Sequence, residues 1–133
     1  MQGPTPRVLC TEDHSDTRDL IRFVLGAEGF EVTCAESPHH AIYLAQSQQF
    51  DLYLLDNWPP GISGVELCEK LREFDPHTPI LFFSSGAYEA DKQRAFNCGA
   101  QEYLTKPADG DVLTSKVRGL IAKSKRSQAG REG

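Results

Sequence analysis

A short run of four apolar residues, Leu52 to Leu55, constrains the fold of this chain more than any other stretch. It leads directly into a carboxylate, Asp56, and a loop rich in proline and glycine follows at residues 57–64. A continuous apolar run of this length, bounded by turn residues, is typical of a strand buried on both faces of a parallel sheet. Asp56 would then lie at the carboxyl edge of the sheet, where α/β proteins bind ligands, or it would only cap the loop.

The segments on both sides of this strand alternate between strand patterns and helix patterns. Strands are predicted at residues 7–11, 31–35, 52–55, 79–83 and 102–105. Amphipathic helices are predicted at about residues 15–28, 37–48, 63–75, 89–98 and 109–123. Strict alternation of this kind predicts an α/β fold with a parallel sheet and right-handed crossovers. We expect an N-terminal extension at residues 1–6, one domain at residues 7–123 and a disordered polar tail at residues 124–133.

The bulk composition argues against several classes of function. A formal net charge of −5 argues against a nucleic-acid-binding surface. No apolar run is long enough to span a bilayer, and the first residues do not resemble a signal peptide. We therefore expect a cytoplasmic protein with no membrane partner and no direct nucleic-acid partner. The four cysteines form no C-x-x-C pair, and we interpret them as small buried side chains rather than as disulfides or zinc ligands.

Polar side chains stand where four of the predicted strands end. The first strand is followed by Glu12 and Asp13, the third by Asp56, the fourth by Ser84 and the fifth by Lys106. If the first and third strands are neighbours, three carboxylates come together and need a cation, and their hard oxygen donors suit Mg²⁺. The Ser84 hydroxyl and the Lys106 ammonium could bind phosphoryl oxygens at the same edge. The pattern therefore predicts a site that places a phosphoryl group on a carboxylate.

Taken together, these features resemble the receiver domain of two-component response regulators, including the chemotaxis receivers, over about residues 7–123. The motifs that carry the resemblance are Glu12-Asp13, the apolar strand ending at Asp56, Pro60-Gly61-x-x-Gly64, Pro79, Ser84 and Tyr103-x-x-Lys106-Pro107. The resemblance implies a flavodoxin-like, doubly wound (βα)5 fold. It also implies a five-stranded parallel sheet in the order 2-1-3-4-5.

The family resemblance further implies a role for each matching residue. Asp56 matches the aspartate that accepts the phosphoryl group, and Ser84 and Lys106 match the hydroxyl and the ammonium that contact it. Tyr103 matches the aromatic switch that turns inward when Ser84 moves. The implied protein ligands of Mg²⁺ are Glu12, Asp13, Asp56 and the backbone carbonyl of Trp58.

A protein of this kind is a phosphorylation-dependent signalling switch and not an enzyme, apart from its own phosphoryl transfer and dephosphorylation. The implied partners are a sensor histidine kinase or a phosphotransfer protein, a downstream protein target, and a second copy of the chain. The implied output face comprises the helix at 89–98, the fifth strand and the last helix. We also expect Trp58 to shield the phosphoryl group, and Gly86 to leave the opposite side open, so that both positions set the lifetime of the phosphorylated state.

Two other functions remain as alternatives. A receiver-like module that binds partners without phosphorylation would normally lack one of the acids or the lysine, and this chain has them all. An aspartyl-phosphate hydrolase would need a second acid two residues after Asp56, where this chain has Trp58. Individual residues also have structural interpretations, because Glu12-Asp13 could simply begin a solvated helix and Tyr103 could simply pack in the core.

Overall fold

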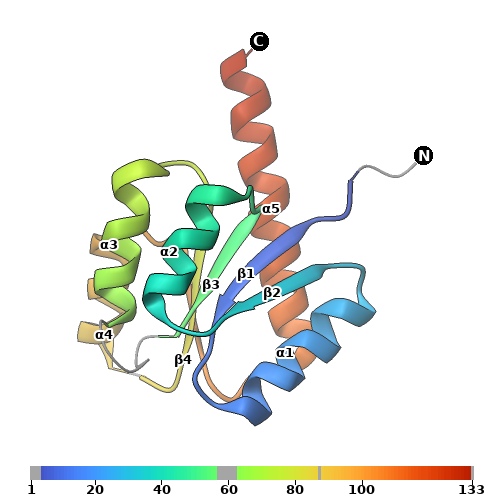
Figure 1. The fold of residues 1–133 in the computed structure, drawn as a ribbon, viewed down its shortest axis with the longest axis vertical. Helices are drawn as coiled ribbons and strands as arrows, with labels where there is room; N and C mark the ends of the chain where they lie inside the picture. Colours follow the sequence, from blue (N-terminus) through green and yellow to red (C-terminus); the bar gives the residue numbers. More distant parts are fainter. Residues whose placement is uncertain (1–3, 57–62, 87, 133) are drawn as a thin grey trace.

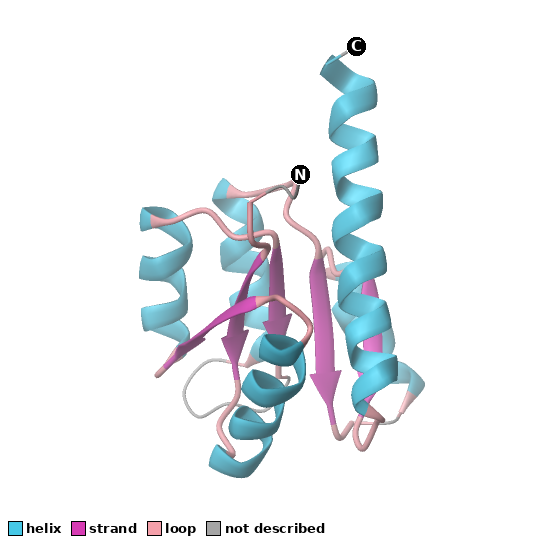
Figure 2. Cartoon of the chain, turned by 90° about the vertical axis from the view of Figure 1, so that its right-hand side faces the viewer, coloured by secondary structure: helices cyan, strands magenta, loops and turns pink. Residues whose placement is uncertain are grey.

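The computed structural model describes residues 4–56, 63–86 and 88–132, with side chains through Gln128. In this part of the chain, five parallel strands form one sheet with helices on both faces (Figure 1; Figure 2). The strands are β1 (Arg7–Thr11), β2 (Glu31–Ala35), β3 (Leu52–Leu55), β4 (Ile80–Ser84) and β5 (Glu102–Thr105). The helices are α1 (Ser15–Ala27), α2 (Pro38–Ser47), α3 (Gly64–Phe74), α4 (Glu89–Asn97) and α5 (Gly110–Glu132).

The strand order is β2-β1-β3-β4-β5, and every neighbouring pair is parallel. This order confirms the predicted doubly wound (βα)5 fold and makes β1 and β3 neighbours at the centre of the sheet. The apolar run of β3 is buried along its whole length, as a central strand covered on both faces must be.

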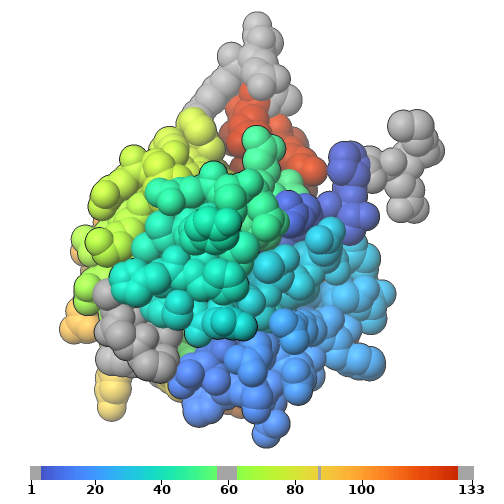
Figure 3. Space-filling model, in the orientation of Figure 1, coloured from blue at the N-terminus to red at the C-terminus, as the bar shows by residue number. Residues whose placement is uncertain are grey.

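The core lies in two layers, one on each face of the sheet, because successive strand residues point to opposite sides. One layer packs under α2, α3 and α4, and includes Leu9, Tyr53, Leu55, Leu67, Leu71 and Phe82. The other packs under α1 and α5, and includes Val8, Cys10, Ile21, Leu25, Leu54 and Val117. Figure 3 shows one side of the molecule, where α1, α2 and α3 cover most of the surface.

The predicted helix starts at Ser37 and Ser63 are confirmed by their caps. The Ser37 hydroxyl accepts a 3.0 Å hydrogen bond from the backbone N–H of His40, and Pro38 occupies the first helical position. The Ser63 hydroxyl accepts a 3.1 Å bond from the backbone N–H of Glu66. Each cap satisfies a backbone donor that the first turn of a helix leaves unpaired.

Arg72 joins several elements at the amino edge of the sheet. Its guanidinium donates to the carbonyl oxygens of Gly99, Asp75 and Thr78 over 2.7–3.1 Å. It also donates to Oε1 of Gln101, which in turn accepts a 2.8 Å bond from the backbone N–H of Ile80. One side chain of α3 therefore holds the start of β4, the end of α4 and the residue before β5.

Two expectations about the helices differ from the structure. Leu20, Phe74 and Val112 belong to the apolar stripes of the predicted amphipathic helices, but they are 53%, 39% and 41% exposed, because the buried stripes are narrower than the sequence pattern. The polar tail predicted to be disordered from residue 124 continues α5 as helix to Glu132. Its lysine, arginine, glutamine and alanine residues are good helix formers, and polarity alone does not prevent a helix from continuing. In the described ranges, no helix combines the length and apolar character needed to cross a bilayer.

Candidate functional site

The parallel register brings the polar residues after β1, β3, β4 and β5 to one edge of the sheet. All strands point toward this carboxyl edge (Figure 2). Thr11 pairs with Leu55, so that the next residues, Glu12 and Asp56, come side by side. The backbone N–H of Asp56 donates a 3.2 Å hydrogen bond to the carbonyl of Thr11, which fixes this neighbourhood. Where β4 and β5 end, the backbone N–H of Lys106 donates a 2.8 Å hydrogen bond to the carbonyl of Ser84.

The Lys106 ammonium bridges two buried carboxylates at this edge. Its Nζ lies 2.7 Å from Oε1 of Glu12 and 3.4 Å from Oδ2 of Asp56. Glu12 is 4% exposed and Asp56 is 5% exposed. Buried charges are stable only when they are paired, so the lysine balances the charge that the two acids bring into the protein.

The pKa of Glu12 is raised above its ordinary value, because the effects that raise it outweigh those that lower it. Burial makes the largest contribution, because it disfavours the charged carboxylate, and the nearby Asp56 charge adds to it. The hydrogen bond and the charge of Lys106 act in the opposite direction, as does the backbone N–H of His14, which donates to Oε2 of Glu12 at 3.2 Å. Burial therefore makes the charged form of Glu12 less favourable, and a nearby cation offsets part of this cost.

Ser84 lies at the same edge and is fully buried at the end of β4. Its hydroxyl accepts a 3.5 Å hydrogen bond from the backbone N–H of Gly86. Asp13, in contrast, is exposed, at the start of the β1–α1 connection. The structure thus brings Glu12, Asp56, Ser84 and Lys106 to one edge, with Asp13 on its solvent side.

The donor set suits Mg²⁺ in its chemistry, because Glu12, Asp13 and Asp56 offer hard carboxylate oxygens at a partly open edge. Within residues 4–56, 63–86 and 88–132, however, no three acidic, histidine or cysteine side chains are grouped closely enough to hold a metal ion. Lys106 is the cation that contacts Glu12 and Asp56 here. Trp58, Pro60 and Gly61 lie outside the described residues, so the structure gives no account of the proposed carbonyl ligand or of the loop motif.

Tyr103 lies inside the molecule next to β4. Its ring is 8% exposed and stacks on Phe82 with ring centroids 6.0 Å apart and an interplanar angle of 7°. Its hydroxyl donates a 2.7 Å hydrogen bond to the carbonyl oxygen of Gly86. A Cβ atom added at Gly86 would lie 3.0 Å from both the Tyr103 hydroxyl and Oδ2 of Asp91. The expectation that Gly86 leaves open space is therefore wrong, because Tyr103 and Asp91 fill the side to which a side chain would point.

Sequence reasoning missed three residues around this site. Arg18 of α1 donates a 3.3 Å hydrogen bond to the carbonyl of Glu12. Asp91 of α4 is buried beside Gly86 and pairs with Arg94 at 3.4 Å. Among the described residues, Thr11 has a buried hydroxyl oxygen with no hydrogen-bond partner. Asp91 lies four residues before Ala95 on the buried face of α4, and Thr11 is the last, polar residue of an apolar strand; both signals were available in the sequence.

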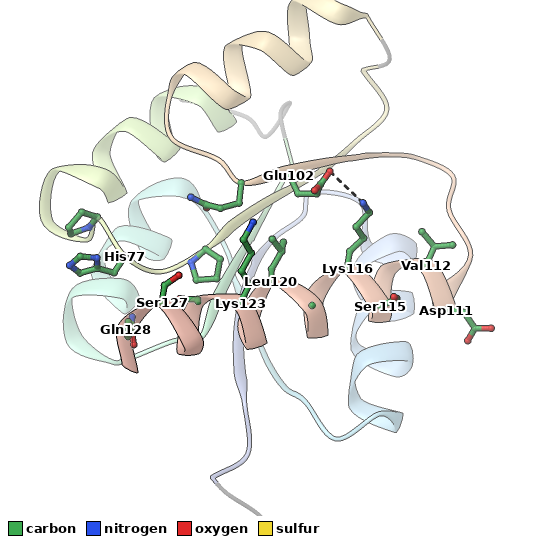
Figure 4. A pocket seen from close by; sticks show the side chains of 15 residues that line it. His77, Glu102, Asp111, Val112, Ser115, Lys116, Leu120, Lys123, Ser127 and Gln128 are labelled. Carbon is green, nitrogen blue, oxygen red and sulfur yellow. Dashed lines mark ion pairs between the residues drawn. The ribbon is translucent and has the colours of Figure 1, made fainter. Parts of the chain in front are cut away.

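A separate groove of about 720 Å³ runs along α5, and its lining does not include Glu12, Asp13 or Asp56 (Figure 4). Glu102 of β5 and Lys116 of α5 form an ion pair of 3.5 Å across it. The groove extends along α5 from Asp111 to Gln128, and His77 closes the end near Gln128. Part of the predicted output face, β5 and α5, is therefore hollowed and lined by both apolar and charged side chains.

The strand order and the residues at the carboxyl edge define a flavodoxin-like α/β domain, and comparisons with known proteins identify its family. The sequence matches the family model of the response regulator receiver domain over residues 8–118. The chain therefore belongs to the receiver domain family of two-component response regulators. Its members are signalling domains rather than classical enzymes.

Individual relatives agree with this family. The chain is 33% identical over 123 residues to the phosphate regulon transcriptional regulatory protein PhoB of Rhizobium meliloti, covering 90% of this chain and 54% of that protein. It is 33% identical over 119 residues to the cell cycle transcriptional regulator CtrA of Caulobacter vibrioides, covering 90% of this chain and 52% of that protein. The chain thus spans about half the length of these curated relatives.

Solved structures show the same fold. A CheY-like receiver domain protein from Methanospirillum hungatei superposes with a TM-score of 0.89 at 24% identity, covering 93% of this chain and 99% of the other. The chemotaxis protein CheY4 of Vibrio cholerae superposes with a TM-score of 0.81 at 26% identity, covering 88% and 99%. Receiver domains of this size therefore occur as whole chains in solved structures.

Proposed function

We propose that this receiver domain is a switch that accepts a phosphoryl group on Asp56. The observation that carries the proposal is the buried Asp56 carboxylate at the carboxyl edge of the central strand, 3.4 Å from Lys106 Nζ. The donor would be a phosphohistidine of a sensor kinase or of a phosphotransfer protein, or a small phosphodonor. A carboxylate oxygen of Asp56 would attack phosphorus, and the bond from phosphorus to the donor nitrogen or oxygen would break.

The residues around Asp56 support this chemistry through charge. An anionic carboxylate and an anionic phosphoryl donor repel each other, and Lys106 offsets part of that repulsion. Mg²⁺, held by Glu12, Asp13 and Asp56 together with the carbonyl of Trp58, would supply further neutralisation of the phosphoryl oxygens. The Ser84 hydroxyl would then donate a hydrogen bond to the new phosphoryl group. The Lys106 contact with Glu12 would weaken as the ammonium turns to the added negative charge.

We further propose that the output surface is the face formed by α4, β5 and α5. The hydroxyl of Tyr103, a residue of β5, bonds to the carbonyl of Gly86, two residues after Ser84. A displacement of Ser84 would therefore move the bonding partner of Tyr103. Tyr88, just before α4, Phe96 of α4 and Val112 of α5 are exposed apolar side chains, with Tyr88 80% exposed. Exposed apolar side chains on these elements favour a protein partner, either a downstream target or a second copy of the chain.

The test is phosphorylation by acetyl phosphate in the presence of Mg²⁺, followed by intact mass and by the fluorescence of Trp58, the single tryptophan of the chain. The wild-type protein should gain one phosphoryl group, and the Asp56→Asn variant should gain none. Omission of Mg²⁺ should slow the reaction. An unmodified wild-type protein, or a modified Asp56→Asn variant, would exclude Asp56 as the acceptor.

One observation favours a second function, a receiver-like module that binds partners without phosphorylation. Lys106 already bridges Glu12 and Asp56, and no three potential ligands are grouped around a metal position in the described part of the chain. Such a protein would bind its target equally well with or without acetyl phosphate. The same mass experiment separates the two functions, because only the switch takes up a phosphoryl group.

A further inference from the structure

The four thiols of this chain lie as two pairs, although the sequence shows no paired motif. Cys10 of β1 and Cys34 of β2 are register partners on adjacent parallel strands. Both belong to the core layer under α1 and α5, so their side chains share one face of the sheet. Cys68 and Cys98 form the second pair, between α3 and the end of α4.

The spacing of the first pair suits a disulfide bond. Neighbouring strands lie about 4.8 Å apart, and the Cα atoms of disulfide-bonded cysteines are usually about 4.4–6.8 Å apart. Cys10 and Cys34 are paired in the register and point to the same core layer, so their side chains start from neighbouring positions on one face of the sheet. Bond formation would therefore require only side-chain rotation and small backbone shifts.

The two thiols differ in access. β2 is one of the two edge strands of the sheet (Figure 1), and Cys34 is partly exposed on it, whereas Cys10 is fully buried. A small oxidant from solvent should therefore react with Cys34 before Cys10.

The two thiols also differ in charge environment. The hydrogen bond from Cys10 and the charges of Arg22 and Arg18 lower the pKa of Cys34 to about 7, against the opposing effect of burial. Thiolates are the reactive form of cysteine, and nearby arginines favour them, so Cys34 is the attacking member of the pair.

We propose that Cys34 and Cys10 form an oxidisable dithiol, in which a hydroperoxide converts Cys34 to a sulfenic acid that Cys10 resolves to a disulfide. In the first step the Cys34 sulfur attacks a peroxide oxygen, the O–O bond breaks, and with hydrogen peroxide the departing hydroxide takes up the thiol proton as water. In the second step the Cys10 sulfur attacks the Cys34 sulfur and the S–O bond breaks. A second water leaves with the Cys10 proton, so two thiols lose two electrons to one peroxide.

The second pair provides an internal comparison. The Cys68 thiol donates to the carbonyl of Cys98 at 3.3 Å, and the Cys98 thiol donates to the carbonyl of Ala95 at 3.0 Å. Both thiols are thus engaged with backbone acceptors. The hydrogen bond from Cys68 lowers the pKa of Cys98 as well, but the charge beside Cys98 is the carboxylate of Glu69, which opposes a thiolate, instead of two arginines. Oxidation should therefore occur at Cys34 first.

The test is mild oxidation of the full chain with hydrogen peroxide, followed by intact mass and by peptide mapping of disulfides without reduction. The wild-type protein should lose two hydrogens, and the map should join the peptides of Cys10 and Cys34. A variant with both Cys68→Ser and Cys98→Ser should give the same product, because it keeps the reactive pair.

Two further variants assign the steps. Cys34→Ser, at a partly exposed position of the edge strand, should form no disulfide under the same conditions. Cys10→Val, which preserves an apolar side chain in the core, should stop at the sulfenic acid of Cys34, which dimedone traps. Four thiols that stay reduced, a disulfide that maps to Cys68 and Cys98, or oxidation that persists in Cys34→Ser would each overturn the proposal. Phosphorylation of Asp56 enters none of these readouts.

Discussion

Lys106 Nζ lies 2.7 Å from Oε1 of Glu12, and this ion pair joins residues that are 94 positions apart in the chain. Both side chains are largely shielded from water, with 14% and 1% of their surfaces exposed. Removal of one partner from such a pair leaves an uncompensated charge in the protein. The contact therefore connects the stability of the domain to the charge balance of its site.

We expect Lys106→Met to lower the free energy of unfolding at pH 7 by about 3 kcal/mol, because Glu12 and Asp56 lose their shared cation. Added Mg²⁺ should restore part of the loss if the carboxylates bind it. Urea unfolding with and without Mg²⁺ measures both effects. The matched control is Lys116→Met, whose partly exposed pair with Glu102 should be worth less than about 1 kcal/mol. Equal losses in the two variants would contradict the prediction.

A second prediction concerns Tyr53 and Asp75, whose hydroxyl and carboxylate oxygens are 2.6 Å apart. Burial acts to raise the pKa of Asp75, but hydrogen bonds from Thr78, Tyr53 and the backbone of His77 outweigh it, and the pKa falls below 3.8. A carboxylate with a lowered pKa stabilises the fold above its ordinary pKa. That stabilisation is lost as the pH falls from this value through the pKa of the folded state.

Tyr53→Phe should therefore cost about 1–2 kcal/mol at pH 7, since it removes a hydrogen bond to a charged group. The variant should also lose less stability than wild type when the pH falls below 4, because Asp75 then has a more ordinary pKa. Urea titrations across this pH range test both statements. Tyr43→Phe, at an exposed position on α2, is the control and should change neither quantity. A pH dependence unchanged in Tyr53→Phe would count against the assigned hydrogen bond.

A third prediction compares two glycines with left-handed backbones. Gly29 and Gly99 have φ angles of 91° and 112°, so alanine is strained at both positions. A Cβ atom at Gly99 would also lie 2.9 Å from Nε of Arg72, whereas at Gly29 no described atom lies within 4 Å. Gly99→Ala should therefore destabilise the fold by about 1–3 kcal/mol more than Gly29→Ala, through disturbed bonds from Arg72. Thermal and urea unfolding of both variants give the difference, and equal losses would refute this account.

A fourth prediction concerns Gly86 and Tyr103. Gly86→Ala should force the Tyr103 hydroxyl or Asp91 to move, because the new methyl group would lie 3.0 Å from each. Combination with Tyr103→Phe, which removes one of the crowded atoms, should cost less than the sum of the single changes, with a coupling of about 0.5–2 kcal/mol. A double-mutant cycle in urea measures the coupling, and strictly additive losses would contradict it. Gly119→Ala on α5 has open space around it and serves as the control.

The sequence patterns predicted the strands and the polar residues that follow them, and the family resemblance implied the strand order that brings these residues to one edge. Apolar runs such as Leu52–Leu55 and the polar residues after them, Asp56 and Lys106, are local patterns, and the parallel sheet determines where they meet. The bridge from Lys106 to Glu12 and Asp56 was not predicted, because contacts between side chains of separate elements depend on rotamers that local patterns do not determine. The roles of Asp56, Ser84, Lys106 and Tyr103 in signalling stay predictions.

Features that depend on register or on tertiary packing were not predictable in the same way. Cys10 and Cys34 are 24 positions apart, and only the β1–β2 register places them side by side. The hydrogen bond from the Tyr103 hydroxyl to the carbonyl of Gly86 joins separate elements, and no local pattern indicates it. The helical continuation of α5 past residue 123 was missed because its residues are polar, although they have good helix propensity.

The network of Arg72 gives the two edges of the sheet different mechanical properties. At the amino edge, the Arg72 guanidinium of α3 bonds to the carbonyls of Asp75, Thr78 and Gly99. These connections should therefore move together as one rigid unit. At the carboxyl edge, the Gly86 segment is bonded to Ser84 and Tyr103, and the Lys106 segment is bonded to Ser84 and paired with Glu12 and Asp56. A rearrangement that begins at Asp56 would therefore pivot α4 about its C-terminal end, with the largest displacement at Tyr88 and almost none at Gly99.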